Sequence, residues 1–446
     1  MVYPRELAVK ILNKVELGLY SNLTLNRYLT LDINPKDRAF VTELVYGIIK
    51  NKLRLDYIIS QFSKIKPSKM SKNILNILRL GVYQIVFLDR VPDFAAINES
   101  VNLAKRLENK KVAAFVNAVL RTILREKHNV TYPDPQKTPE EYLSIYYSFP
   151  VWMIKRWINL FGYKFTEDLC KAFNEKSKTC IRINTLKTNK EELKAIFAGE
   201  KVETSPGLYV DEALYLESSP PLMSLPSFKE GLFLPQDESS MIAAKAIDAK
   251  SGEKILDVAA APGGKTSYFA QSMDNQGHIT AWDIHPHRVK LIEETCRRLG
   301  VSIVKAELKN AKNIDMESLD GYDKVLVDAP CSGLGIIRRK PDIKWSKSPK
   351  DITALKAEQQ EILEVCSRYV KPGGILVYST CSIEPEENQG IVDSFLRKNT
   401  DFSYDDIRLY LPKSLNFDDP AGFIQLYPNI HGTDGFFVAR LKKSRF

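Results

Sequence analysis

Apolar residues in the first third of the chain recur at the spacing of helices. Ile97, Val101, Ala104 and Leu107 follow one another every three or four positions and so share one helical face. Residues 73–88 are apolar almost throughout, which predicts a central buried helix. No alternating stretch interrupts this pattern. It predicts an all-α domain over residues 1–135.

The pattern changes after a proline-rich stretch at residues 131–142. Residues 143–235 combine an aromatic-rich helix with short alternating strands, which predicts a small α+β connector domain. From residue 236 to residue 446, strands alternate with helices. This order predicts an α/β, Rossmann-like domain with a mostly parallel sheet, helices on both faces, and ligands at the carboxyl ends of the strands.

Composition narrows the class of protein. A chain of 446 residues is too long for one ordinary core, and 44% hydrophobic with 27% charged residues is typical of globular proteins. The longest apolar runs are too short to span a bilayer, so we expect no membrane association. The N-terminus has no apolar signal core, and the six cysteines show no CxxC pair. We expect a reduced, cytoplasmic monomer without a bound metal.

The positive charge is concentrated at one end of the chain. Residues 1–128 hold 22 Lys+Arg against 11 Asp+Glu, whereas the remaining residues hold 42 against 44. Clustered cations gain free energy from counterion release at phosphates, which favours a nucleic-acid-binding module. The alternative is a set of solvated helix faces.

A glycine-rich turn, DVAAAPGGKT (residues 257–266), follows the first predicted strand of the α/β domain. Its last three residues match the second half of a phosphate-binding loop, G-x-x-x-x-G-K-[ST]. Ala259 stands where that loop needs its first glycine, and Pro262 removes a backbone donor. A nucleotide hydrolase therefore remains an alternative, with Asp328 in the place of its magnesium-binding acid.

The next predicted strand ends in a carboxylate that suggests a different ligand. Asp283 follows Asp257 by 283 − 257 = 26 residues, close to the roughly 20-residue offset of ribose-binding acids in dinucleotide sites. The pyrophosphate fingerprint G-x-G-x-x-G is absent. A ribose without a pyrophosphate favours S-adenosylmethionine as the cofactor, against the alternative of a structural turn beside an ordinary surface aspartate.

Two cysteines stand just past predicted strand ends, in DAPCSG (Cys331) and STCS (Cys381). If those strands are neighbours in the sheet, both thiols and Asp328 reach one cleft. The other four cysteines lie on helix or strand patterns and are expected to be buried as small apolar side chains; they are Cys170, Cys180, Cys296 and Cys366.

The motifs DVAAAPGGKT, DAPCSGLG, RRKPDIKW, YSTCSIEPEEN and DGFFVAR together resemble the Nop/Sun family of RNA 5-methylcytosine methyltransferases. The N-terminal third is similar to the NusB-type helical RNA-binding fold that bacterial members carry. The resemblance covers nearly the whole chain. It implies transfer of a methyl group from S-adenosylmethionine to C5 of a cytosine in RNA, with 16S ribosomal RNA as the expected partner.

The resemblance also implies roles for individual residues. Cys381 would be the nucleophile that attacks C6, Asp328 would hydrogen-bond the N3 edge of the base, and Cys331 would assist release of the product. Asp283 would bind the cofactor's ribose, and Asp328 is also expected to contact the cofactor. The glycine turn would wrap its methionine end with Ala259, Ala260, Ala261, Pro262, Gly263, Gly264 and Lys265.

Some assignments stay open. DNA cytosine-C5 methyltransferases use the cysteine at the position of Cys331 as nucleophile. The family's adenine-binding aspartate has no counterpart near Glu307 and Leu308. In RRKPDIKW the consecutive cations are candidates for phosphate contacts, and we expect Trp345 to pack against the sheet rather than stack on a base. Alternative functions are a transfer-RNA methyltransferase and a non-catalytic RNA-binding assembly or antitermination factor.

Overall fold

The computed structural model describes residues 3–29, 33–415 and 422–445. The chain folds into two compact units. The first, which we call the helical unit, comprises Met1–Glu175 and Ile337–Ser346; the second, the sheet unit, comprises Lys176–Ile336 and Lys347–Phe446. The three-domain division with boundaries at residues 135, 143, 235 and 236 stays a prediction.

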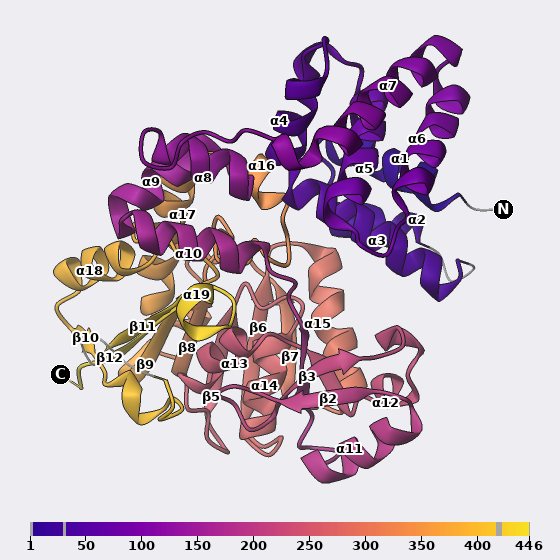
Figure 1. The fold of residues 1–446 in the computed structure, drawn as a ribbon. Coiled ribbons are helices and arrows are strands. Elements are labelled where there is room, and N and C mark those ends of the chain that lie inside the picture. Colours follow the sequence, from indigo (N-terminus) through magenta and orange to yellow (C-terminus); the bar gives the residue numbers. More distant parts are fainter. Residues whose placement is uncertain (1–2, 30–32, 416–421, 446) are drawn as a thin grey trace. The chain divides into compact units, whose positions relative to one another are not determined.

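The helical unit confirms the predicted all-α N-terminal region (Figure 1). Its helices are α1 (Pro4–Val15), α2 (Ser21–Tyr28), α3 (Pro35–Lys50), α4 (Lys52–Phe62), α5 (Lys72–Phe87), α6 (Asp93–Leu107), α7 (Lys110–Glu126), α8 (Pro139–Tyr147), α9 (Val151–Phe161), α10 (Tyr163–Asn174) and α16 (Ile343–Ser346). The apolar residues of α5 are buried in one core with those of α1, α3, α6 and α7.

Local signals explain where these helices begin and how closely they pack. The Ser71 side chain accepts a hydrogen bond from the Ile74 amide and caps α5, and Asn109 caps α7 in the same way. At Gly47 in α3, an added Cβ would lie 2.0 Å from the ring of Tyr83 in α5. A glycine is therefore needed where these two helices cross.

The sheet unit contains two sheets. The smaller is antiparallel, in the order β2-β3-β1-β4, and is accompanied by α11 (Lys190–Gly199) and α12 (Pro226–Lys229). Its strands are β1 (Thr179–Ile183), β2 (Glu203–Pro206), β3 (Ala213–Ser218) and β4 (Phe233–Pro235).

The larger sheet has the order β10-β12-β9-β8-β5-β6-β7, with β11 beside β12. Its first strands are β5 (Lys254–Val258), β6 (His278–Asp283), β7 (Val304–Leu308), β8 (Tyr322–Asp328) and β9 (Val370–Thr380), all parallel. The antiparallel edge is formed by β10 (Phe402–Tyr404), β11 (Phe423–Leu426) and β12 (Phe436–Lys443). This confirms the predicted, mostly parallel α/β sheet.

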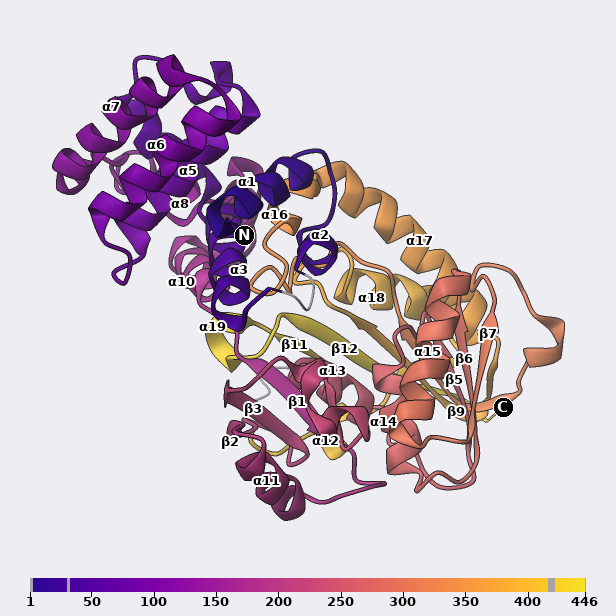
Figure 2. The ribbon, with the colours of Figure 1, turned by 90° about the vertical axis from the view of Figure 1, so that its right-hand side faces the viewer.

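Helices cover both faces of this sheet, and successive strand residues alternate between two cores. Ile255 and Leu326 belong to one core, whereas Leu256 and Val325 belong to the other. Figure 2 shows α15 and α17 on opposite sides of the sheet. The helices are α13 (Glu238–Lys245), α14 (Gly264–Ser272), α15 (Pro286–Leu299), α17 (Pro349–Ser367), α18 (Gln389–Lys398) and, after β11, α19 (Pro428–His431).

Residues 337–346, which we call the inserted segment, belong to the helical unit although they lie between β8 and β9 in sequence. Figure 1 shows their short helix α16, in orange, among the indigo and magenta helices. Trp345 packs against the helical core and donates its indole N–H to the Ile49 carbonyl at 2.9 Å. The prediction that Trp345 packs against the sheet is therefore wrong, because the chain leaves the sheet before it reaches this residue.

Lys344 fixes the inserted segment within the helical unit. Its fully buried ammonium group donates to the Lys50 carbonyl at 3.2 Å, the Ser148 carbonyl at 3.1 Å and Asn174 Oδ1 at 2.8 Å. It also lies 3.6 Å from the centroid of the Phe149 ring. Burial holds the pKa of Lys344 well below its ordinary value.

We predict that Lys344→Met destabilises the helical unit by roughly 1–3 kcal/mol, because buried acceptors lose their donor. Since the folded-state pKa of Lys344 is lowered, the unfolded chain binds more protons between that pKa and about 10.4, and stability should rise with pH in this window. Urea unfolding at pH 7 and pH 9.5, followed by tryptophan fluorescence, measures both effects.

The matched control is Lys340→Met, which changes an exposed lysine of the same segment. It should leave both the stability and its pH dependence unchanged. If the Lys344→Met variant keeps the wild-type rise in stability between the two pH values, that rise does not come from Lys344.

Candidate active site

The pairing of β8 with β9 brings the two cysteine motifs together. Asp328, the last residue of β8, lies opposite Ser379 in the parallel ladder. Cys331 follows the first strand and Cys381 follows the second, and their Sγ atoms are 3.2 Å apart. The strands are neighbours, which is the condition under which the sequence places both thiols in one cleft, and both cysteine residues are half-buried.

A buried carboxylate joins the two cysteine loops. Glu387 accepts hydrogen bonds from the Ser332 amide at 2.8 Å, from the Ser382 hydroxyl at 2.6 Å and from Gln359 Nε2 at 3.0 Å. Gln359 also donates to the Pro330 carbonyl at 2.9 Å. The sequence analysis missed this role, although Glu387 lies in the same motif as Cys381. The motif contains several glutamates, and the sequence alone does not show which of them is buried.

Asp328 lies in an ion pair beside the thiols. Lys265 Nζ donates to its Oδ2 at 2.7 Å, and the Ser379 hydroxyl donates to its Oδ1 at 2.7 Å. Burial alone would lower the pKa of Lys265, but the Asp328 carboxylate raises it above its ordinary value, and a Cys381 thiolate acts in the same direction. The ammonium group therefore stays charged next to the nucleophile candidate.

The two thiols are not equivalent. The hydrogen bond with Cys381 and the burial of its own sulfur raise the pKa of Cys331 well above the ordinary value. Cys331 is therefore held as the protonated thiol of the pair.

The glycine turn has a conformation that few residues adopt. Ala259 has φ 58° and Gly263 has φ 95°, both in the left-handed region. An alanine there costs roughly 1–2 kcal/mol, which the surrounding bonds must offset. The Ala260 amide donates to the Trp282 carbonyl at 2.9 Å, and the Gly263 amide donates to the Ala260 carbonyl at 2.8 Å. The turn is thereby fixed at the ends of β5 and β6.

The phosphate-loop alternative does not fit the side chains of this turn. The Lys265 ammonium is paired with Asp328, and the Thr266 hydroxyl donates to Asp257 Oδ2 at 2.5 Å. Burial raises the pKa of Asp257 to about 7, although Thr266 and Lys265 act to lower it. The lysine and the hydroxyl of a phosphate loop are thus engaged inside the protein.

Asp283 retains an oxygen suited to a ribose. One carboxylate oxygen, Oδ1, accepts the His285 amide at 3.0 Å, while Oδ2 has Arg288 at 4.0 Å. With an acceptor at the end of β6 and a tight backbone turn at the end of β5, these residues fit S-adenosylmethionine.

The position beyond β7 lacks the expected carboxylate for an adenine. Glu307 accepts the Trp282 indole N–H at 3.1 Å and pairs with Lys305 at 2.7 Å, so it is engaged within the sheet edge. Leu308 is 56% exposed. Its exposed apolar side chain offers a surface for an aromatic ring rather than a hydrogen bond.

No helix in the described part of the chain is long and apolar enough to cross a membrane. Within the same residues, no three His, Cys, Asp or Glu side chains are grouped so that they could hold a metal ion.

Three family models match successive parts of the chain. Residues 3–125 match the NusB family, residues 149–223 match the ferredoxin-like domain of RsmF/B-like methyltransferases, and residues 244–442 match the 16S rRNA methyltransferase RsmB/F.

Curated relatives match over the full length. A probable ribosomal RNA small subunit methyltransferase B of Bacillus subtilis is 38% identical over 98% of both chains. A protein of the same description from Synechocystis is 34% identical over 100% of both chains.

Solved structures share the fold. PH0851 is 28% identical with a TM-score of 0.82 over 99% of each chain. A methyltransferase homolog of Pyrococcus horikoshii is 31% identical with a TM-score of 0.59, over 70% of this chain and 100% of its own. The full-length identity to these relatives and the matched models show that the chain belongs to the RsmB/F family of 16S ribosomal RNA methyltransferases, whose methyl donor is S-adenosylmethionine.

Proposed function

We propose that this methyltransferase acts on C5 of a cytosine in 16S ribosomal RNA through a covalent bond between Cys381 and C6 of the base. The observation that supports the proposal is the thiol pair, with Sγ atoms 3.2 Å apart, beside the Lys265–Asp328 ion pair. A nucleophile, a proton carrier and a second thiol are the groups that this chemistry needs.

C5 of an aromatic cytosine is a poor nucleophile, so the ring must first be activated. Addition of the Cys381 thiolate to C6 forms the S–C6 bond and moves the C5–C6 π electrons toward C5 and N3. C5 then has the electron density to accept a methyl group, which S-adenosylmethionine supplies when it is bound. Cys381 is preferred to Cys331 as the nucleophile because Cys331 keeps its proton.

Negative charge that develops on N3 needs a proton or a hydrogen bond. Asp328, which Lys265 and Ser379 hold in place by hydrogen bonds of 2.7 Å, would take the proton that the Cys381 thiol gives up and donate it to N3 of the base. Lys265 balances the charge of both Asp328 and the attacking thiolate. The ion pair would therefore stabilise the base while it is attached to Cys381.

Release requires that the C5 proton leave and that the S–C6 bond break. The electrons of the C5–H bond restore the C5–C6 double bond and expel Cys381 as a thiolate. Cys331, in hydrogen-bond contact with that sulfur, would pass its own proton to the departing Cys381 thiolate and take up the C5 proton in its place, so that both cysteines end as thiols.

For the cofactor, we assign residues 259–265 to the methionine end and Asp283 to the ribose. The fixed turn and the Asp283 Oδ2 atom, whose ion-pair partner Arg288 is 4.0 Å away, support this assignment. A relative, NSun6 from Pyrococcus horikoshii, was solved with the S-adenosylmethionine analogue SFG; it is 26% identical, with a TM-score of 0.57 over 65% of this chain and 97% of its own.

The two cysteines should give opposite phenotypes. We predict that Cys381→Ala abolishes methylation and covalent capture of RNA, because no sulfur adds to C6. Cys331→Ala should accumulate a protein–RNA adduct, because attack and transfer proceed while release stalls. Transfer from labelled S-adenosylmethionine to unmodified 16S ribosomal RNA, with denaturing gels for adducts, measures both.

Transfer RNA and a reaction without RNA are the matched controls. If only transfer RNA is labelled, the substrate is transfer RNA and not 16S ribosomal RNA. An adduct with Cys381→Ala but none with Cys331→Ala would reverse the assignment of the nucleophile. Cofactor binding without any transfer would favour the non-catalytic RNA-binding factor.

Glu387 should act as a positioning residue. We predict that Glu387→Gln lowers kcat by about tenfold to a hundredfold, since misplacement of a catalytic group by about 1 Å has such effects. The amide nitrogen would replace Oε2, which accepts from the Ser332 and Ser382 hydroxyls at 2.5 and 2.6 Å, and the loss of this acceptor would loosen the cysteine loops. Affinity for S-adenosylmethionine should stay unchanged, because within the described residues the Glu387 carboxylate accepts hydrogen bonds from the cysteine loops and α17 alone.

Glu361→Gln serves as the control, because this exposed carboxylate of α17 pairs with Lys312 at 3.4 Å on the surface. It should leave kcat unchanged. A Glu387→Gln variant with wild-type kcat would show that the loops hold the thiols without this carboxylate.

A further inference from the structure

The helical unit contains a cavity of about 260 Å³. It lies between the end of α1, the loop that leads to α2, the end of α3, the start of α4, the first half of α5 and the inserted segment. A cavity of about 150 Å³ is sufficient for one benzene ring. The space is therefore large enough for a single nucleobase and too small for a folded peptide element.

Aromatic side chains line this cavity. The Trp345 ring is held in place by the bond from its indole N–H to the Ile49 carbonyl. Tyr20, in the loop before α2, is 59% exposed and also lines the cavity. A fixed indole and an exposed phenol form a surface on which flat rings stack, and stacking is how proteins hold unpaired bases.

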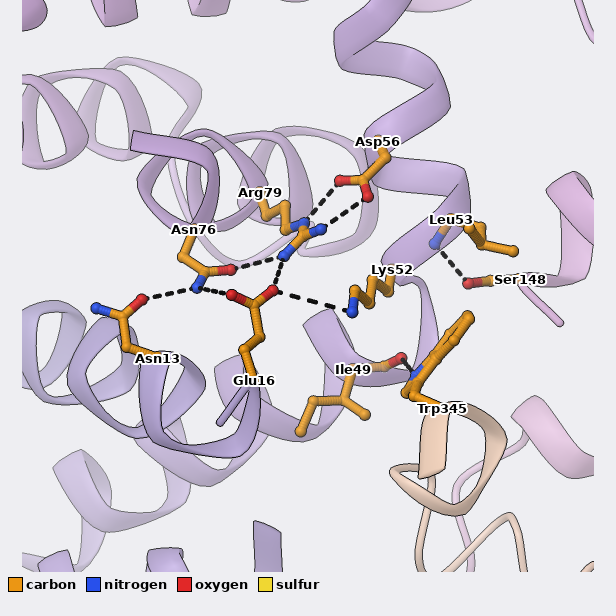
Figure 3. A network of polar contacts seen from close by, with 10 residues as sticks. All are labelled: Asn13, Glu16, Ile49, Lys52, Leu53, Asp56, Asn76, Arg79, Ser148 and Trp345. Carbon is orange, nitrogen blue, oxygen red and sulfur yellow. Dashed lines mark hydrogen bonds and ion pairs between the residues drawn. The ribbon is translucent and has the colours of Figure 1, made fainter. Parts of the chain in front are cut away.

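The two cations that line the cavity, Arg79 and Lys52, differ in how many hydrogen bonds and ion pairs they make. Arg79 donates to both oxygens of Asp56, at 2.6 and 2.7 Å, and to Glu16 and Asn76 (Figure 3). Lys52 has only Glu16 Oε1 at 3.9 Å and the Trp345 ring, 5.4 Å from its Nζ, and it makes no hydrogen bond within the described chain.

Of these two cations, Lys52 is therefore the one with donor capacity to spare. Burial and the charge of Arg79 lower its pKa, so an acceptor brought next to the ammonium group would relieve an existing cost. Figure 3 shows Lys52 reaching from the start of α4 toward Glu16, with Trp345 close beneath it.

The presence of both a carboxylate and an ammonium group in the cavity favours some kinds of ligand over others. Glu16 presents a carboxylate and Lys52 an ammonium group in one cavity, which matches a base edge that has both an exocyclic amine and a ring carbonyl. A bare polyanion would be repelled by Glu16. The excess of Lys and Arg over residues 1–128, 22 against 11 acidic residues, favours a ligand whose backbone is negatively charged.

We propose that this cavity, which we call the Trp345 pocket, binds one unpaired base of the RNA substrate. The base stacks on Trp345, Lys52 donates to its ring carbonyl or to the adjoining phosphate, and Tyr20 stacks on the neighbouring base. The proposal rests on the proposed function in that RNA is the substrate, and it adds a recognition site outside the sheet unit.

The test measures RNA binding by the full chain with Cys381→Ala, so that no covalent capture contributes. The probe is a fluorescein-labelled, single-stranded RNA of ten nucleotides and mixed sequence, followed by fluorescence anisotropy. Lys52→Gln, Trp345→Leu and Tyr20→Ala should each raise Kd by about tenfold, the loss that one stacked or paired base contributes. If Lys52 contacts a phosphate, its variant also lowers the salt dependence by about one charge.

Matched controls remove the same chemistry elsewhere in the helical unit. Lys111→Gln changes an exposed lysine of α7, and Phe94→Ala changes an aromatic side chain of α6 that is 76% exposed. Both should bind within twofold of the parent. Because Tyr20 is exposed, Tyr20→Ala tests the pocket even if Trp345→Leu fails to fold.

Pocket variants that bind the probe as tightly as the controls would overturn the proposal. Methyl transfer by the same variants with Cys381 intact separates the two hypotheses. If these variants methylate RNA with a wild-type KM, the proposed methyl transfer is supported and base binding in the Trp345 pocket is excluded. If the pocket variants lose probe binding but the protein with Cys381 intact does not methylate cytosine, base binding in the pocket is supported and the proposed chemistry is excluded.

Discussion

The parallel pairing of β8 with β9 is the constraint on which the candidate site depends. Asp328 and Ser379 are opposite one another in the ladder, and each cysteine lies two or three residues further along its strand's exit. Leu326 and Val377 point into one core, while Val325 and Leu376 point into the other. A slip of one residue would exchange these faces, so the packing of two cores fixes the separation of the two thiols.

Within that frame, the buried charges act as a group. Lys265 is the cation that offsets Asp328, and it would also offset a Cys381 thiolate. Burial gives Asp257 a pKa of about 7, so near neutral pH it adds only part of a negative charge to this region. A second fully ionised carboxylate would disfavour the Cys381 thiolate that we propose as the nucleophile. The burial of Asp257 is thus compatible with the proposed chemistry next to it.

The sequence was sufficient for features that local patterns determine. Alternating strands and helices predicted the parallel sheet, and motifs at strand ends predicted that Cys331 and Cys381 would meet. Glu387 escaped prediction because its burial depends on Ser332 and Gln359, which are 55 and 28 residues away. Trp345 was misplaced for the same reason: its partner, Ile49, is 296 residues away in sequence. Contacts of this kind leave no trace in local periodicity.

The inserted segment also limits how independent the helical unit can be. Ile337 and Lys344 are fully buried and Ile343 nearly so, and without the helical unit they would face water. The loop that carries Cys331 continues into this segment, and its Gly335 amide donates to the Cys381 carbonyl at 3.0 Å. The Cys331 loop and the inserted segment are therefore one continuous stretch of backbone, so the conformation of one constrains the conformation of the other. A ligand that binds the helical unit can therefore change the conformation of the loop only if it binds one conformation of that backbone more tightly than another. The size of the change is limited by this difference in binding free energy.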